Sequence, residues 1–516
     1  MLTKKTLMRA VVASLAATIS LAAQPLRAQD AGALLDLLVK KKLITDQEAE
    51  EVRGELVKES AQTSTGKWKL STPLTELELY GDVRLRYNYV GGETKDRGPV
   101  ASPGAGVAGT NDWTERSRER YRLRLGLRGT LMDDWFFGIR LETNQNPRST
   151  NVTFGADSSS SSPGGGGPFA KGDDGINVGQ AYAGYKGFPD FTFTGGKMPN
   201  PLITTRMVWD PDINPEGLAE QWKHTFTFNL GGGGGEAAPT YSKEGKAVVA
   251  PAAEPFKLKL DLFANFAQFV YDDANPENPL GARATTSANG PSQLVPNTDA
   301  FLLAWQVGGR LTFPNNVYFQ VAPVLYNYTG NGDTFNVHFQ GGSPYLTNSA
   351  SLAQNQTGIN SLLVLEVPME VGWKLWDLPM RIFSDFAVNF EADDRADAAG
   401  QAGHGSQRYA YLAGLSVGQL KEKGDWQVDI WYQHADQFSL DPNLIDDDIF
   451  NAQLNLQGVA VQATYNLTAA VNVALTYAHG WWYNHNLGTG GVPSQATGIN
   501  PTTEYNWVTA DLNVKF

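Results

Sequence analysis

The feature that most constrains this chain is an alternation of polar and apolar residues that starts near residue 76 and recurs to the end. From Glu76 to Asn88 the even positions are mostly polar and the odd positions mostly apolar, which is the period of a β-strand with two different faces. About 16 segments share the pattern, an even number, as is usual for single-chain bacterial barrels. They lie near residues 76–88, 116–131, 134–146, 175–187, 190–197, 219–229, 256–271, 299–313, 315–328, 360–376, 379–391, 407–418, 425–437, 452–466, 469–481 and 504–516.

Two architectures alternate in this way, a membrane-spanning β-barrel and a large soluble β-sandwich. A sandwich builds a dry core between its sheets, but here the polar faces carry charge at successive positions, which a packed interior could not hold without a severe desolvation cost. The apolar faces carry aromatic residues near strand ends, as in the girdles of membrane barrels, for example Tyr87, Tyr89, Trp305, Trp373, Trp426 and Tyr432. We therefore expect residues 75–516 to form an all-β transmembrane domain, an antiparallel outer-membrane β-barrel of about 16 strands.

The connections between the segments alternate in length. Met132-Asp133, Phe188-Pro189 and Pro314-Asn315 are tight, whereas stretches such as 91–115 and 147–174 are long and rich in Gly, Ser, Asn and Pro. Short turns on one side and long loops on the other match periplasmic turns and extracellular loops.

The N-terminal region predicts export. Lys4, Lys5 and Arg9 precede an apolar run and a small-residue cleavage region, so residues 1–28 are expected to be a signal peptide. Residues 29–60 place leucines at three- and four-residue steps, which predicts a pair of short periplasmic amphipathic helices, with 61–74 as a polar linker. The helices could pack on each other or on neighbouring subunits, or the region could be a mobile tether.

Arginines dominate one face of the second segment. Arg116, Arg118, Arg120, Arg122 and Arg124 occupy successive even positions, and an arginine facing lipid near the bilayer midplane costs roughly 2–4 kcal/mol. We therefore predict that this face lines the lumen; neighbouring segments add Arg84, Arg86 and Arg140. Two interpretations stay open: the arginines pair with lumen acids such as Glu78, Asp82 and Glu142, or they select solutes by charge.

Residues 198–218 interrupt the strand pattern. Four prolines, which cannot donate ladder hydrogen bonds, stand at 199, 201, 211 and 215. The segment also carries Arg206, Asp210, Asp212 and Glu216. Irregular backbone at membrane depth is tolerated only inside a cavity, so we predict a constriction loop folded into the barrel. An ordinary extracellular loop is the alternative.

Other kinds of site find little support. The chain has no cysteine, which excludes disulfides and thiolate metal sites, and a net charge of −13 argues against a nucleic-acid partner. No nucleophile with a base is visible, so we expect no enzyme and no cofactor. The acidic clusters at 391–394 and 446–448 lack the alternate-residue spacing of a calcium loop, so we expect solvated loops without a metal.

The chain also resembles known outer-membrane proteins. Its last strand, Val508 to Phe516, ends on an aromatic residue and resembles the terminal signature that the barrel-assembly machinery recognises. Residues 34–52, 180–186, 196–201 and 208–219 resemble the bacterial family of putative porins. The resemblance implies a porin-like barrel and, as in porins generally, a homotrimer.

These observations together predict a function. We expect an outer-membrane porin that lets small hydrophilic solutes or ions diffuse passively through a water-filled, arginine-lined pore. The alternative is a plugged or sheath-type barrel that acts as a scaffold for a periplasmic or redox partner.

Overall fold

The computed structural model divides the chain into two compact units, Met1–Ser71 and Thr72–Phe516. The described residues all belong to the second unit: 73–94, 113–144, 149–155, 175–230, 240–241, 247–248, 257–272, 282–285, 293–296, 300–329, 361–398, 401–489 and 502–516. The predicted signal peptide, the predicted helices at 29–60 and nearly all of the linker therefore lie outside the described residues.

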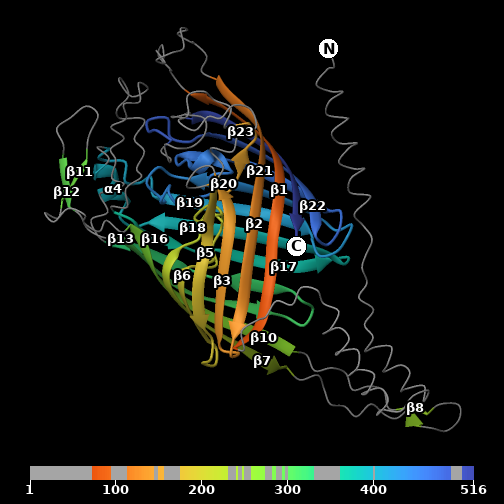
Figure 1. Cartoon of the computed structure of the whole chain (residues 1–516). Helices are drawn as coiled ribbons and strands as arrows, with labels where there is room; N and C mark the ends of the chain where they lie inside the picture. Colours follow the sequence, from red (N-terminus) through yellow and green to blue (C-terminus); the bar gives the residue numbers. More distant parts are fainter. Residues whose placement is uncertain are drawn as a thin grey trace, which may run out of the picture. The chain divides into compact units, whose positions relative to one another are not determined.

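Within the described residues, sixteen antiparallel passes form one sheet that closes on itself. The closure joins the first pass to the last, because β1 pairs with β2 on one side and with β23 on the other. Figure 1 draws β1, β2, β3 and β5 as neighbours in the wall. In chain order the passes are β1 (Leu74–Thr94), β2 (Trp113–Leu131), β3 (Trp135–Asn144) with β4 (Val152–Thr153), β5 (Gly175–Tyr185), β6 (Phe191–Lys197), β7 (Glu216–Asn229), β10 (Lys257–Asp272), β13 (Ala300–Thr312), β14 (Tyr318–Val321) with β15 (Val324–Thr329), β16 (Leu363–Glu366) with β17 (Met369–Leu375), β18 (Leu378–Asn389), β19 (Tyr409–Gly418), β20 (Trp426–Ala435), β21 (Leu456–Asn466), β22 (Val471–Trp482) and β23 (Thr502–Lys515). The predicted barrel of about 16 strands is confirmed.

The remaining elements are short. They are two small hairpins, β8 (Thr240–Tyr241) with β9 (Ala247–Val248) and β11 (Ala282–Thr285) with β12 (Gln293–Pro296), the helix α4 (Ala392–Ala398) and the 3-10 turn η3 (Phe450–Ala452). Among the described residues, no helix has the length and apolar character needed to cross a bilayer.

Local sequence explains the tight turns and the split passes. Trp376 and Asp377 have φ values of 49° and 67° between paired Leu375 and Leu378, the backbone of a type I′ hairpin, whose twist suits the flanking strands. Pro323 separates β14 from β15, since proline cannot donate to the sheet ladder. Pro368 separates β16 from β17 in the same way.

The two faces of each strand have opposite character. On β13, Phe301, Trp305 and Val307 are 38–56% exposed on the outer face. Leu302, Ala304 and Gln306, at the alternate positions, are at most 1% exposed. The apolar side chains on the outside are therefore accessible, as a lipid-facing surface requires, while the inner face is covered by other parts of the chain.

Two segments cover that inner face. We call residues 198–215, between β6 and β7, the first inner segment, and residues 436–455, between β20 and β21, the second inner segment. Their side chains form one buried cluster with inward-facing wall residues such as Val324 and Leu412. The segments contribute Met198, Leu202, Met207, Val208, Trp209, Leu440, Leu444, Ile445, Ile449, Phe450, Ala452 and Leu454.

Candidate functional site

The inner face of β1 and β2 carries a set of arginines that we call the arginine wall: Arg84, Arg86, Arg118, Arg120, Arg122 and Arg124. The register places Arg84 opposite Arg122 and Arg86 opposite Arg120. Like charges directly opposite one another destabilise a sheet, so this wall needs carboxylates close by. Leu123 and Leu125, at the alternate positions of β2, are 39% and 42% exposed on the outer face.

Part of the compensating charge comes from the wall itself. Asp82 accepts hydrogen bonds from Nη2 of Arg122 and from Nε of Arg124, both at 2.7 Å. Asp511 on β23 accepts two from Arg86, at 2.7 Å and 3.0 Å. These are charge-assisted bonds, stronger than neutral ones.

The inner segments supply the rest. An Asp448 carboxylate oxygen lies 2.7 Å from Nη1 of Arg86, which is only 6% exposed. Asp212 lies 3.4 Å from Arg124 and 3.6 Å from Arg122 and also accepts a hydrogen bond from Thr150 at 3.1 Å. Acids from both segments therefore face the arginine wall.

The other predicted site residues lie at different places. Arg140 pairs with Glu142 on its own strand at 2.8 Å, and Arg116 is exposed near the start of β2. Glu216 is the first residue of β7 and pairs with Lys197 at 2.9 Å. The structure thus brings Arg206, Asp210 and Asp212 together but not Glu216.

Polar contacts anchor the first inner segment to the opposite wall. The Thr204 hydroxyl donates to Glu366 at 2.6 Å, and the Thr205 hydroxyl donates to Asp385 at 2.5 Å. The Gln306 side chain accepts a hydrogen bond from the Ile203 N–H at 2.9 Å and donates one to the Ile203 carbonyl at 2.7 Å. Glu366, Asp385 and Gln306 are buried, so each of these hydrogen bonds takes the place of one that water can no longer make.

The second inner segment was not found from the sequence. The acidic run 446–448 predicts a solvated loop, and this prediction is wrong: Asp446 is only 6% exposed and Asp448 binds Arg86. The two inner segments also bond to each other, since Asp210 N–H donates to the Leu444 carbonyl at 2.6 Å and Asp446 N–H donates to the Arg206 carbonyl at 3.2 Å. The missed signal is the apolar series Phe438, Leu440, Leu444, Ile445 and Ile449 on either side of the acidic run.

The acids of the inner segments fall into two electrostatic groups. Burial raises the pKa of Asp446 to about 7, although the Arg206 guanidinium opposes the shift. Burial, with Asp446 beside it, also raises the pKa of Asp210 well above its ordinary value. Burial acts the same way on Asp212 and Asp448, but the facing arginines prevail and hold the pKa of each below its usual range.

Asp210 and Asp446, together with Asp447, have the donors of a cation site. One carboxylate oxygen from each of Asp210, Asp446 and Asp447 lies within 4.8 Å of the others, and carboxylate oxygen is the donor that calcium prefers. Arg206 lies 3.7 Å from Asp446 and already supplies one positive charge to this group.

Three cavities surround the first inner segment. The first, about 350 Å³, lies against the arginine wall and is lined by Asp210, Asp212 and Asp448; we call it the arginine cavity. A second, about 340 Å³, is lined by Trp431, and a third, about 430 Å³, by Trp222. The arginine cavity and the Trp431 cavity share lining residues, as do the Trp431 cavity and the Trp222 cavity. The arginine cavity, which charged side chains line, can hold water and small charged solutes.

Comparisons with known proteins give a family and distant structural likenesses. A family model described as "Putative porin" matches residues 37–371. A triple mutant of the Rhodopseudomonas blastica porin is similar at 11% identity over 86% of this chain and 100% of that chain, with a TM-score of 0.37. The outer membrane channel DcaP of Acinetobacter baumannii is similar at 13% identity over 87% of this chain and 100% of that chain, with a TM-score of 0.36. At these TM-scores the structural likenesses carry no further conclusion. No curated protein matches the sequence.

Proposed function

Because the chain belongs to the family of putative porins, as its motifs predicted, we propose that it is an outer-membrane porin through which small hydrophilic solutes or ions diffuse passively. The observation that carries the proposal is the closed barrel with arginines on one side of its interior and the acids of two inner segments facing them. Charged groups of both signs along an enclosed space favour ions and dipolar solutes over apolar ones.

The outer surface supports a membrane location. Exposed Leu79, Leu125, Ile139 and Trp305 belong to a large set of apolar side chains on the outside, where water would make them costly and lipid would not. On β1 and β2, which carry Leu79 and Leu125, the arginine wall lies on the opposite face. A barrel in the outer membrane suits both faces, because lipid can surround the apolar outer face and water can enter beside the charged inner face.

The first inner segment is the proposed constriction. Arg206, Asp210 and Asp212 all line the arginine cavity, opposite Arg84 and Arg124. A solute that passes here meets positive charge on the barrel wall and negative charge on the inner segments. The resulting transverse field orients dipolar solutes and slows apolar ones.

The partners proposed for the barrel are lipid, other copies and the assembly machinery. Phe516 is held at the seam by two backbone hydrogen bonds with Gly81, at 2.8 Å and 3.1 Å, and its side chain is 56% exposed. An exposed terminal aromatic residue supports recognition by the barrel-assembly machinery. A homotrimer is proposed from the porin family alone.

One observation favours a second function. The inner segments pack an apolar cluster against the barrel wall, as a plug would. The rings of Trp209 and Tyr326 are stacked in this cluster, with their centres 6.5 Å apart. A barrel closed in this way would act as a scaffold for a periplasmic partner and would not conduct.

Single-channel recording in planar bilayers tests the proposal. The purified full-length protein should give conductance steps of stable size in KCl, with a measurable ion preference in a salt gradient. A correctly folded barrel that stays silent would refute the pore and favour the scaffold. Heat-modifiable migration on gels identifies the folded barrel in either case.

A further inference from the structure

The Trp431 cavity differs from the arginine cavity because one of its walls is apolar. Trp431 on β20, Phe383 on β18 and Leu412 on β19 form this wall. Ligand pockets typically span roughly 300–1,000 Å³, so a volume of about 340 Å³ suits a molecule of amino-acid size.

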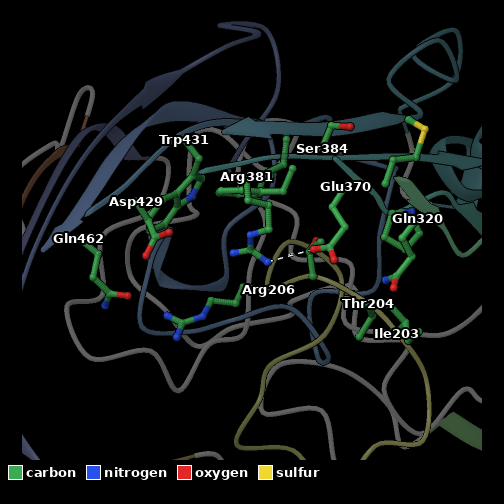
Figure 2. Close-up of a pocket in the computed structure, with 15 residues that line it drawn as sticks. Ile203, Thr204, Arg206, Gln320, Glu370, Arg381, Ser384, Asp429, Trp431 and Gln462 are labelled. Carbon is green, nitrogen blue, oxygen red and sulfur yellow. Dashed lines mark hydrogen bonds and ion pairs between the residues drawn. The ribbon is translucent and has the colours of Figure 1, made fainter. Parts of the chain in front are cut away.

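One charged pair in the cavity is already satisfied. Nη1 of Arg381 lies 3.0 Å from a carboxylate oxygen of Glu370, which Figure 2 marks with a dashed line. The same guanidinium lies 5.0 Å from the centre of the Phe383 ring, a cation–π contact. Arg381 and Glu370 therefore balance each other and leave no net charge for a ligand.

Two other charges in the cavity are less well satisfied. The side chain of Arg206 is 49% exposed, and its ion pair with Asp446 is long, at 3.7 Å. Asp429 accepts hydrogen bonds from the neutral Gln427 amide at 2.8 Å and 3.1 Å, and among the described residues no cation lies within 4.0 Å of it. Figure 2 shows Asp429 and Trp431 on one side of the cavity with Arg206 below them.

We propose that the Trp431 cavity binds a zwitterion with an apolar side chain, an α-amino acid whose side chain is aromatic or branched. Its carboxylate meets Arg206, its ammonium meets Asp429, and its side chain packs on Trp431 and Phe383. This assignment rests on the proposed porin function and names a solute class for it.

The two charges together exclude simpler ligands. A carboxylate without an ammonium would bring a second negative charge toward Asp429, and an amine without a carboxylate would face Arg206. A small zwitterion such as glycine would satisfy both charges but leave the apolar wall uncovered. The apolar wall therefore provides the preference for larger side chains.

The position of the cavity suits a station on a diffusion path. Arg206 and Gln462 line both this cavity and the arginine cavity, so a bound solute lies next to the proposed constriction. Weak binding beside a constriction speeds the passage of a preferred solute, provided that the site releases it.

Block of single-channel current tests the assignment with defined probes. L-phenylalanine and L-leucine should reduce the KCl current saturably, at concentrations at least about tenfold below those needed for glycine, phenylacetate or phenethylamine. If phenylacetate blocks as well as phenylalanine, Asp429 takes no part in binding. If glycine blocks as well as phenylalanine, the apolar wall takes no part. Either result overturns the assignment and leaves the pore intact, whereas a silent channel refutes the pore itself.

Matched variants place the binding at the named residues. Arg206→Gln and Asp429→Asn should each weaken block by phenylalanine about tenfold, and Arg206→Lys should restore part of it. Trp431→Ala should weaken block by phenylalanine but leave that by glycine unchanged. Arg128→Gln is the control, because Arg128 pairs with Glu78 at an exposed site and lines none of these cavities. Unchanged block in both charge variants, with conductance retained, would overturn the proposal.

Discussion

Arg86 links the barrel wall to the second inner segment, and two substitutions separate these roles. Asp448→Asn removes the acid of the inner segment, and Asp511→Asn removes the acid of the neighbouring strand. Both acids lie 2.7 Å from the same guanidinium, so each variant is a control for the other. Only Asp448→Asn should loosen the inner segment.

The expected cost follows from burial. Removing one partner of a buried ion pair costs roughly 3–5 kcal/mol when the other charge is left uncompensated. The Arg86 side chain is only 6% exposed, but it keeps one acid in either variant. We therefore expect each substitution to lower the free energy of unfolding by about 2 to 3 kcal/mol, with Asp511→Asn at least as costly because Asp511 accepts two hydrogen bonds.

Two assays separate the variants. Urea unfolding of the reconstituted barrel measures the free energy, and single-channel recording measures the open-state current. Asp448→Asn should raise the mean conductance and the current noise, because the second inner segment loses its charged contact with Arg86. Asp511→Asn removes the same charge from the arginine cavity but leaves the contact between Arg86 and the second inner segment in place, so its changes in both quantities should be smaller. Equal conductance and noise in the two variants would refute the reasoning.

Three further predictions concern charge and backbone. Replacing Arg118, Arg120 and Arg122 of the arginine wall by glutamine should shift the reversal potential in a KCl gradient toward cation preference. An unchanged reversal potential would show that the wall takes no part in ion selection. Asp446 takes up a proton near pH 7, so lowering the pH from 8 to 6 removes one negative charge from the pore. The reversal potential should therefore shift toward anion preference over this range. The Asp446→Asn variant should lack this shift. Gly196→Ala should cost roughly 2 kcal/mol in urea unfolding, since its φ is 115° and a Cβ would lie 2.3 Å from the Ala181 carbonyl. Gly195→Ala, where the nearest contact is a leucine side chain at 3.1 Å, should cost less; equal losses would contradict the backbone argument.

The strands could be predicted from the sequence because a barrel imposes period two on every pass. Each alternating segment coincides with a pass, and the position of Arg120 and Arg122 on the inner face follows from counting residues along β2. Proline gave a comparable signal for the first inner segment, because Pro199 and Pro201 cannot take part in a strand ladder. Alternation and proline each act within a single strand or segment, so the local sequence is enough to predict their effects.

The pairing of charges could not be predicted in the same way. Asp446 and Asp448 belong to an acidic run with a nearby proline, which is also the composition of a solvated loop. Only the contacts with Arg206 and Arg86 make these acids part of the interior. Those contacts join residues that are hundreds of positions apart, and no period in the sequence encodes them.

The closure of the barrel determines when Arg86 can be neutralised. Its two acids lie 362 and 425 positions later in the chain, so neither has been synthesised when β1 emerges from the ribosome. Until the last strand arrives, this guanidinium must remain hydrated, because burying it alone would cost several kcal/mol. The strand that is made first is therefore among the last to reach its final surroundings, and contacts of such long range make folding slow.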